Sequence, residues 1–519
     1  MRSLIKNVVI CVILLLCMPA FAGTMHSNGK MDEKYDIPSQ VTLFKNVNIW
    51  DGKSNNLKKG YDVMVVRNII HKIAKKIPTK GTYELDVRTG KHKKINIPDP
   101  TSYNNYVIIM SEDDKKPTKK TVKVNVINGK GYTLMPGLIE GHGHLQMNGT
   151  SLTDIAQNRN WEELAIRSSA MAKLAIMSGF TTWRDAGGMG AGLRKTIDAG
   201  IVEGPRIYPS GAFIGPTGSH ADFRTFTMPN ETIHNSNTSS SRLGLTLTAD
   251  GVDMIKAAAR QNFMQGATQV KIMSSGGVAS SFDPWQLDAY SAEEIRAAVE
   301  VADAYHSYVM SHAYSKKSIM RCLENGVKTI EHGFMFDGEI AKLMEKKGAY
   351  ITTNMTAFSP YLSQIEAISS SPAASRKAAS ATKSFKNYIA NIKKYKPKLG
   401  FQADCVGGVQ DCIKQMDHSI WLNANFFGNL HALKSMTSVN GEIMKLSGEV
   451  LDPYPYGKLG VIEEGAYADL LLIEGNPIKD ISLIGGNEKW FDAEPRAIDG
   501  IKSMRLIMKD GKIYKNTMQ

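Results

Sequence analysis

The chain reads Pro136-Gly137-Leu138-Ile139-Glu140-Gly141-His142-Gly143-His144, a short apolar run that ends in two histidines. Residues at positions i and i+2 of a β-strand point to the same side, so both imidazoles can reach one metal ion. Two histidines this close also arise by chance. The pair therefore indicates a metal site only if further ligands from elsewhere in the chain join it.

After residue 135 short apolar runs alternate with helical patterns, which is typical of βα units around a parallel sheet. A helix over 292–305 fits this rhythm, and the Asn- and Ser-rich segment 229–241 is expected to be a long surface loop or a lid. Eight strands, the number that a closed barrel requires, are predicted at 133–138, 180–184, 206–210, 268–273, 308–311, 328–330, 349–353 and 398–403.

The two ends of the chain have a different pattern, in which β-like runs alternate with turn residues over 41–135 and again over 458–515. The polar segment 80–120 within the first of these is expected to be an insertion on a loop. We therefore predict an α/β protein: a (β/α)8 TIM barrel with a small β-sandwich domain formed from both chain ends. The predicted boundaries are 1–22 for a signal peptide, 23–135 and 439–519 for the two parts of the β domain, and 136–438 for the barrel.

The first 22 residues have the features of a secretion signal. Arg2 and Lys6 precede an apolar run over 8–18, and Ala20-Phe21-Ala22 supplies the small residues that a signal peptidase needs. A membrane anchor is the alternative, but the run is shorter than the roughly 20 residues that span a bilayer. We expect an exported protein, periplasmic or secreted, that is not held at a membrane once the signal is removed.

Charge and cysteine content narrow the classes of partner. The net charge of +13 at pH 7 falls to +11 without the signal, and an excess of positive charge can indicate nucleic acid or a membrane surface. Much of it lies in the lysine-rich stretch 91–123, which a solvated loop explains, so no nucleic-acid partner is expected.

Cys322, Cys405 and Cys412 are too few for a disulfide scaffold, and either a Cys405–Cys412 pair or three free thiols is compatible with the sequence.

Further candidate ligands follow the predicted strands. Lys271 lies in the fourth strand, His312 just past the fifth, His332 just past the sixth and Asp404 just past the eighth. The carboxyl ends of barrel strands meet on one face, so these distant residues are expected to gather beside His142 and His144. Imidazole and carboxylate groups suit a divalent metal such as zinc, which lowers the pKa of water from 15.7 to about 7.

These motifs together resemble the amidohydrolase superfamily, within its imidazolonepropionase-like branch that includes prolidase-type dipeptidases and ochratoxinase-like enzymes. The resemblance runs in order from about residue 41 to the C-terminus. Its matching stretches are PGLIEGHGH from Pro136, GFTTWRDAGG from Gly179, GPRIYPSG from Gly204, QVKIMSSGGV from Gln269, SHAY from Ser311, IEHG from Ile330 and GVIEEGAYADLLLIEGNPIKDI from Gly460.

The resemblance implies a metal centre with two divalent ions, zinc being the expected metal. It assigns His142, His144 and Asp404 to the first ion and His312 and His332 to the second. It also implies that CO2 converts Lys271 into an anionic carbamate that bridges both ions, since a cationic amine would be repelled there.

Three residues are candidates for catalysis. Asp404 is expected to take a proton from a metal-bridging hydroxide and deliver it to the leaving nitrogen. His220 follows the third predicted strand, where related enzymes have a substrate-facing histidine, and an ordinary structural histidine is the alternative. Tyr314 either donates its hydroxyl to the developing oxyanion or is a buried structural residue.

The predicted reaction is hydrolysis of a C–N amide bond, with a dipeptide or an N-acyl amino acid as the substrate. A lactone or an organophosphate is the alternative, because the same hydroxide attacks all of these centres. A catalytically inactive binding relative is disfavoured because all six ligand positions hold competent residues. Relatives usually have Gly-Thr-Asp where this chain has Gln402-Ala403-Asp404, which leaves the substrate range open, and a homo-oligomer is compatible with the sequence.

Overall fold

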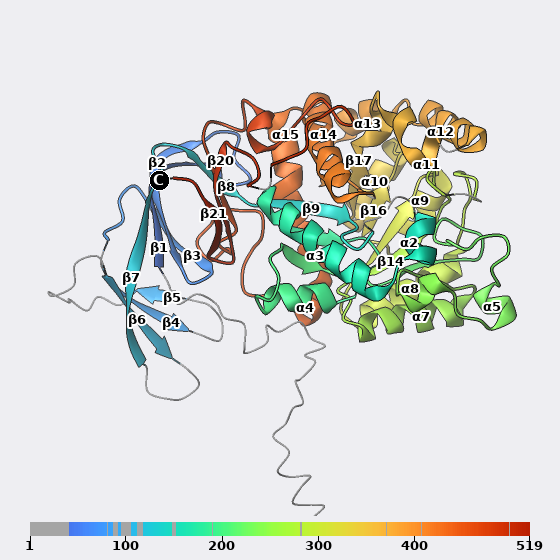
Figure 1. Cartoon of the computed structure of the whole chain (residues 1–519), viewed down its shortest axis with the longest axis horizontal. Helices are drawn as coiled ribbons and strands as arrows, with labels where there is room; N and C mark the ends of the chain where they lie inside the picture. Colours follow the sequence, from blue (N-terminus) through green and yellow to red (C-terminus); the bar gives the residue numbers. More distant parts are fainter. Residues whose placement is uncertain are drawn as a thin grey trace, which may run out of the picture.

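The computed structural model describes residues 41–79, 81–86, 92–94, 105–111, 118–147, 152–188, 190–280, 283–369, 371–405, 407–497 and 499–518. Two parts are visible in Figure 1: parallel strands covered by helices, and beside them a sheet with few helices. The predicted signal peptide and several lysines of the 91–123 stretch lie outside the described residues.

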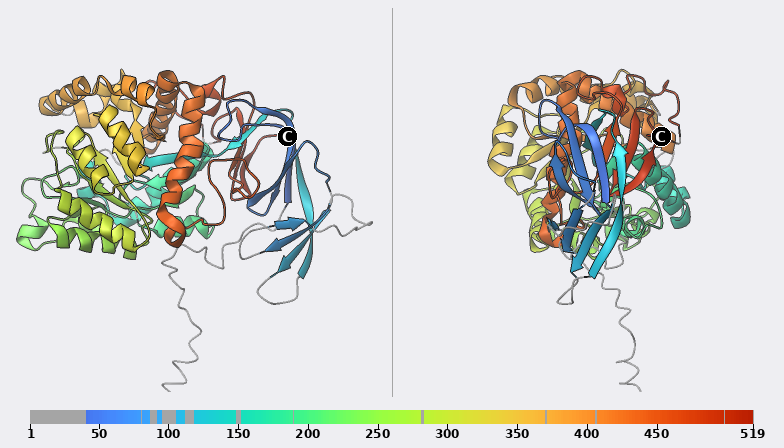
Figure 2. Two further views of the ribbon diagram at one scale, coloured as in Figure 1. Left: turned by 180° about the vertical axis from the view of Figure 1, so that it is seen from behind. Right: turned by 90° about the vertical axis from the view of Figure 1, so that its left-hand side faces the viewer.

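The second of these parts is an eleven-stranded mixed sheet built from both ends of the described chain. The blue strand β1 and the red strands β20 and β21 therefore lie in one sheet (Figures 1 and 2). Its strands are β1 (Val41–Ile49), β2 (Lys58–Val66), β3 (Ile69–Ala74), β4 (Gly81–Asp86), β5 (His92–Lys94), β6 (Asn105–Ser111), β7 (Thr118–Asn128), β8 (Thr133–Pro136), β19 (Leu470–Ile473), β20 (Met504–Lys509) and β21 (Lys512–Asn516).

The other strands form two parallel sheets, of three and seven strands. Their order is β11-β10-β9 and β13-β12-β14-β15-β16-β17-β18, and the sheets adjoin where Asp404, just after β18, donates its N–H to the His142 carbonyl. The strands are β9 (Leu138–Gly143), β10 (Phe180–Asp185), β11 (Arg206–Tyr208), β12 (Phe213–Gly215), β13 (Thr246–Thr248), β14 (Val270–Met273), β15 (Val309–Ala313), β16 (Thr329–His332), β17 (Tyr350–Asn354) and β18 (Leu399–Gln402).

Helices connect these strands and bury one face against them (Figure 2). In α8 (Ala292–Ala304), for example, Ser291 and Glu294 form a capping box, and Ile295, Ala298 and Val301 are buried. The other α-helices are α2 (Leu152–Asn158), α3 (Trp161–Met177), α4 (Gly192–Asp198), α5 (Glu231–His234), α6 (Ser239–Arg242), α7 (Val252–Met264), α9 (Lys316–Glu324), α10 (Gly338–Lys347), α11 (Glu366–Ser369), α12 (Pro372–Ser384), α13 (Tyr388–Tyr395), α14 (Val409–Phe427), α15 (Asn429–Lys434), α16 (Asn440–Met444) and α17 (Gly448–Leu451).

The predicted first barrel strand, 133–138, is wrong in its position. The chain changes sheets at Gly137: β8 pairs with β1 and β19 of the mixed sheet, whereas β9 pairs with β10. Gly137 permits this change because a Cβ there would lie 2.0 Å from the Thr181 hydroxyl. The parallel strand therefore ends at Gly143, directly before His144.

Two predicted loops contain regular structure. The 80–120 insertion holds β4, β5 and β6, and β6 pairs with β4 and β7. The sequence Tyr106-Val107-Ile108-Ile109 accounts for β6, since aromatic and β-branched residues favour strands. The 229–241 segment contains α5 and begins α6, each capped at its N-terminus by a side chain, that of Asn230 or Thr238.

The sequence left open whether Cys405 and Cys412 are paired. Cys405 and Cys412 form a disulfide, and Cys322 is a buried free thiol.

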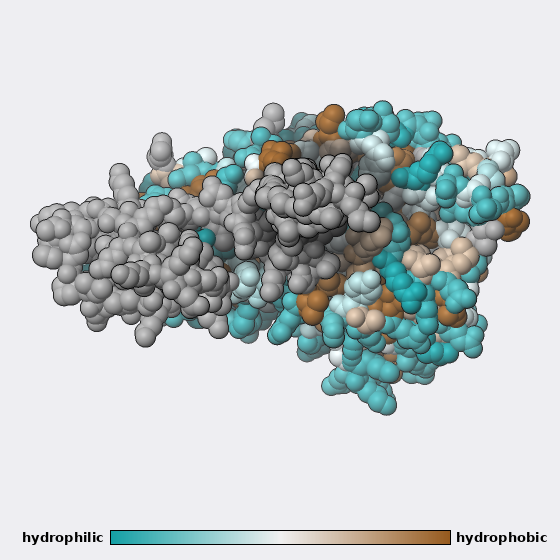
Figure 3. All heavy atoms as spheres, turned by 90° about the horizontal axis from the view of Figure 1, so that it is seen from below, coloured by the Kyte–Doolittle hydropathy of each residue, from teal (hydrophilic) through white to brown (hydrophobic). Residues whose placement is uncertain are grey.

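Hydrophilic residues cover most of the described surface seen in Figure 3, with hydrophobic residues scattered among them. No helix among the described residues combines the length and apolarity that a bilayer crossing needs.

Candidate metal centre

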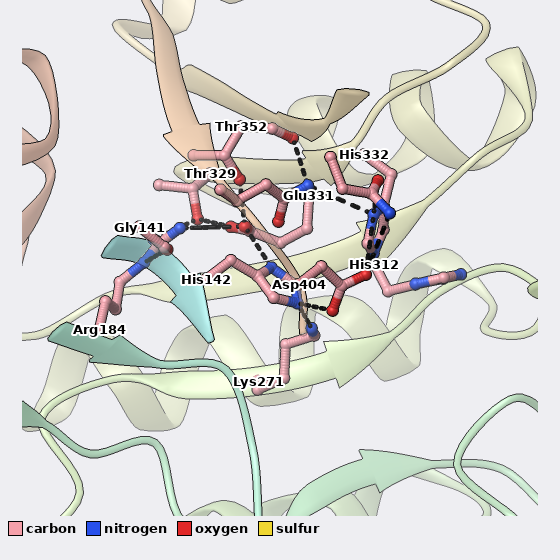
Figure 4. Close-up of polar contacts among 12 residues, drawn as sticks. Gly141, His142, Arg184, Lys271, His312, Thr329, Glu331, His332, Thr352 and Asp404 are labelled. Atoms are coloured by element: carbon pink, nitrogen blue, oxygen red, sulfur yellow. Dashed lines mark hydrogen bonds and ion pairs between the residues drawn. The ribbon is translucent and has the colours of Figure 1, made fainter. Parts of the chain in front are cut away.

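The six predicted ligands lie together at the C-terminal ends of the parallel strands (Figure 4). They come from β9, β14, β15 and β16, and from the residues that follow β9 and β18. Five of the side chains are buried, and that of Asp404 is 21% exposed. The set is His142, His144, Lys271, His312, His332 and Asp404.

Asp404 forms a compact triad with His142 of β9 and with His144, which directly follows that strand. One Asp404 oxygen, Oδ1, lies 3.4 Å from His142 Nε2 and 3.2 Å from His144 Nε2. The ligand atoms of the three residues all lie within 4.8 Å of one another. One cation can be held by all three, because its bonds to imidazole and carboxylate ligands are about 2.0–2.2 Å long.

The other Asp404 oxygen faces the second histidine pair. Oδ2 lies 3.8 Å from His332 Nδ1, and the rings of His312 and His332 have centroids 4.6 Å apart. The His332 ring also lies 5.1 Å from that of His142, so the two pairs adjoin. The Asp404 carboxylate is thus placed between two potential cation positions.

Lys271 points into the same cluster, with its Nζ 3.3 Å from His142 Nε2. Burial lowers the pKa of this amine to about 8, against the opposing effect of Glu331 and Asp404. A large fraction of the Lys271 side chain is therefore neutral near pH 8, which leaves a nucleophilic lone pair on Nζ.

The ionisation states of the other groups suit cation binding. Burial lowers the pKa values of His142, His312 and His332, which favours the neutral imidazole that binds metals. Burial alone would raise the pKa of Asp404, but the neighbouring His142, His144 and His332 outweigh it and hold that pKa below its usual range. The site thus offers neutral nitrogen ligands and one anionic oxygen ligand.

Two of these residues have an unusual backbone. His332 and Asp404 have φ angles of +71° and +52°, in the left-handed region that non-glycine residues rarely occupy. Each such conformation costs on the order of 1–3 kcal/mol and must be held by its surroundings. Functional positions are where such strain gathers.

Glu331 orients His142 and was not among the residues identified from the sequence. Its Oε2 lies 2.8 Å from His142 Nδ1, and both of its oxygens accept hydrogen bonds of 3.0 Å from Arg184 Nη2. Thr329 and Thr352 also donate to this carboxylate. Arg184 is fully buried and acts through Glu331 (Figure 4).

Replacing Glu331 with glutamine is expected to lower the free energy of unfolding by about 3–5 kcal/mol, because the Arg184 guanidinium is left buried without its partner. It should also weaken metal binding about 10–100-fold through His142. Denaturant unfolding of the metal-free protein measures the first effect. The matched control is Glu442→Gln, which removes a pair with Lys398 whose side chains are both more than half exposed and which should cost under about 1 kcal/mol. Equal losses in the two variants would contradict the proposed importance of the buried pair.

His220 and Tyr314 both lie against His312. The His220 ring stacks on that of His312 at 4.3 Å, and the Tyr314 ring lies 4.5 Å from it. Burial lowers the pKa of His220 to about 4, so its ring is neutral at pH 7. Gly277 allows this position, since a Cβ there would lie 2.2 Å from the His220 ring.

A pocket of about 1320 Å³ opens over the cluster, large enough for a small-molecule ligand. The aromatic side chains of Trp285, Phe334 and Phe385 line it together with Tyr314. Lys377 from α12 also lines it and lies 3.8 Å from Asp283. The pocket therefore combines an apolar wall with a cation.

Parallel strands covered by helices, with imidazoles and a carboxylate gathered at their C-terminal ends, define the class of TIM-barrel-like α/β enzymes. Residues 133–513 match the model of the amidohydrolase family, and the chain belongs to that family. Enzymes of this family are generally metal-dependent, which agrees with the triad of His142, His144 and Asp404.

Individual relatives place the chain in the ochratoxinase- and prolidase-like branch. The ochratoxinase of Aspergillus niger is 27% identical over 396 residues, which cover 74% of this chain and 75% of that protein. A solved amidohydrolase superposes with a TM-score of 0.72 at 29% identity, and a prolidase complexed with N-methylphosphonate-L-proline does so with 0.72 at 28% identity. Both structures cover 92% of this chain and are themselves fully covered. The protein is thus a hydrolase acting on amide or peptide C–N bonds.

Proposed function

We propose that this protein is a binuclear metal-dependent amidohydrolase that cleaves a dipeptide or an N-acyl amino acid. The observation that carries the proposal is the position of Asp404 between two histidine pairs, 3.2 Å from His144 on one side and 3.8 Å from His332 on the other. A single carboxylate that faces both pairs suits two cations better than one.

The donor set fits two zinc ions. His142, His144 and Asp404 would hold the first, and His312 and His332 the second, with Lys271 as a carbamate shared by both. When bound, such ions polarise a carbonyl and lower the pKa of water from 15.7 to about 7.

The side chains around the cluster have separate tasks in this proposal. Asp404 accepts a proton from the attacking water at its carboxylate and later gives it to the leaving nitrogen. His220 faces the substrate as a neutral ring, and the Tyr314 hydroxyl donates to the oxygen on which negative charge develops. Burial raises the pKa of Tyr314, which keeps its phenol protonated and able to donate.

The pocket wall supports an amide substrate with an apolar group. Trp285, Phe334 and Phe385 offer aromatic surface, and the Lys377 ammonium, 3.8 Å from Asp283, would be the group that meets a substrate carboxylate. A dipeptide or an N-acyl amino acid carries both features. The prolidase complex with a proline phosphonate, at 28% identity, is consistent with this class of substrate.

The finer points of the fold and the cellular location are also proposals. We infer that eight of the ten strands of the two parallel sheets close into a (β/α)8 barrel over 136–438, and that 23–135 and 439–519 form a β-sandwich domain. Residues 1–22 would be removed on export to the periplasm or the medium. The Cys405–Cys412 disulfide supports an oxidising compartment, since such bonds persist there.

Purified protein reconstituted with zinc is expected to release amino acids from a panel of dipeptides and N-acyl amino acids. A chelator should reduce this activity to under about a tenth, and added zinc should restore it, because the water needs a metal ion to become a nucleophile at neutral pH. Metal analysis should give about two ions per chain. Amino-acid release measured by chromatography is the readout.

The same panel should include lactones and phosphotriesters. Turnover of these at higher kcat/KM than any amide would favour the alternative hydrolase. If zinc is added to the metal-free protein and the protein then hydrolyses none of the three classes, the proposal is wrong.

A further inference from the structure

The segment that carries Asp404 is held by three residues on two neighbouring elements. The Ala403 N–H donates to the buried Glu140 carboxylate, at 3.1 and 3.2 Å, and the Asp404 N–H donates to the His142 carbonyl at 3.2 Å. From α14, Gln415 donates to the Ala403 carbonyl at 2.9 Å. This segment therefore depends on both its neighbouring strand and the following helix.

A covalent bond adds to these contacts directly beside Asp404. Cys405 is the next residue, and Cys412 lies in the first turn of α14, with 5.3 Å between their Cα atoms. Both cysteines are buried, at 3% and 2% exposure, and they pack in one hydrophobic cluster with Ile413 and Met416. The disulfide thus ties the end of β18 to the start of α14.

The chain between the two cysteines contains two glycines, which explains why a crosslink is useful there. It includes Gly407 and Gly408, and glycine has more conformational freedom than any other residue. Gly407 has a φ of +144°, and the hydrogen bond that its N–H donates to the Met147 carbonyl is long at 3.4 Å. A segment of this kind adds little restraint of its own to the left-handed conformation of Asp404, beyond the hydrogen bonds with Glu140, His142 and Gln415.

We propose that the Cys405–Cys412 disulfide is a positioning device that holds the Asp404 carboxylate against His142 and His144, so that the oxidised protein binds divalent metal more tightly than the reduced one. The inference rests on the proposed function, since it takes Asp404 as a metal ligand. The two cysteines act through Asp404 and do not touch the substrate.

A general stabilising crosslink is the competing explanation. Such a crosslink raises the melting temperature because it restricts the unfolded chain, and it leaves the affinity of the folded site for metal unchanged. Zinc affinity therefore separates the two roles, whereas thermal stability changes under both.

The experiment measures zinc affinity of the full-length mature protein by calorimetry. The proteins are the oxidised wild type, the wild type refolded in a phosphine reductant with its thiols counted, Cys405→Ser, Cys412→Ser and the double variant. Loss of the crosslink should weaken zinc binding at least about tenfold, the lower limit for groups that support a metal ligand. The two single variants and the double variant should agree with one another, because either single substitution already removes the bond.

Two controls accompany these proteins. Cys322→Ser alters the remaining thiol, which lies in a different core cluster, and should bind zinc like the wild type. Cobalt-loaded protein reports thiolate ligation as a charge-transfer absorption, which identifies any binding by the freed cysteines of the reduced wild type. The double variant has neither thiol and serves where the reduced protein shows such absorption.

The outcomes are distinct. Unchanged zinc affinity in the reduced wild type and the double variant, or losses in the single variants that add in the double variant, would overturn the inference and leave the proposed function intact. If the oxidised wild type itself binds no zinc, the proposed function is wrong and the inference falls with it.

Discussion

Replacing Asp404 with asparagine is expected to lower kcat/KM for an amide substrate by about 10³-fold, within the range that proton transfer by one side chain contributes. Asparagine keeps the shape of the side chain but cannot accept the proton, and it offers a neutral oxygen where His142 and His144 now face an anion 3.4 and 3.2 Å away. Steady-state kinetics on the zinc-loaded variant measures the effect.

The kinetics should be compared with those of Asp303→Asn, which makes the same change at an exposed position in α8 and should stay within about twofold of the wild type. Circular dichroism shows whether both variants are folded. An Asp404→Asn enzyme with more than a tenth of the wild-type kcat/KM would exclude Asp404 as the group that moves the proton.

The position of the site was predictable because most of its residues lie at or near the C-terminal ends of strands. A polar side chain after each of several apolar runs indicated one end of a parallel sheet, and Lys271, His312, His332 and Asp404 do lie there beside His142. The strand limits were less predictable: His312 and His332 lie within β15 and β16, not past them. Hydrogen bonds to neighbouring strands set these limits, and they are not visible in one sequence.

Glu331 was not identified because it directly precedes His332 in β16. The motif at this position was interpreted only as a source of the metal-binding histidine. A charged residue in a short apolar strand was nevertheless a signal, since an unpaired buried carboxylate is costly. Its partner Arg184 is 147 positions away, and only the folded sheet brings the two together. Glu140 likewise meets its partner, the Ala403 N–H, only in the folded protein. Burial raises the pKa of Glu140 to about 8.

The disulfide and the inserted strands depended on tertiary structure for a different reason. Cysteines seven positions apart pair only if a turn brings their Cα atoms within bonding range, and the start of α14 supplies that turn. For β4 and β6, the high content of polar residues in 80–120 suggested a loop, but β6 pairs with both β4 and β7, and this pairing satisfies their backbone groups. In both cases long-range contacts overrode the local composition.

Replacing Lys271 with methionine is expected to lower kcat/KM by about 10³-fold, because the two proposed cations would lose the anionic ligand that they share. A bound cation contributes several kcal/mol to the transition state, and each 1.36 kcal/mol is a factor of ten. The proposed carbamate forms when the Nζ lone pair bonds to the carbon of CO2 and Nζ releases one proton, which leaves one negative charge. Burial favours this reaction by lowering the pKa of Lys271 to about 8.

The carbamate has its own signature apart from activity. Wild-type protein reconstituted with zinc in ¹³C-bicarbonate should show a carbamate carbon resonance, and Lys271→Met should not. Lys342→Met, on the exposed face of α10, should retain the resonance and bind two zinc ions. A wild type with full activity and two bound ions, but with no such resonance, would mean that Lys271 acts as a free amine.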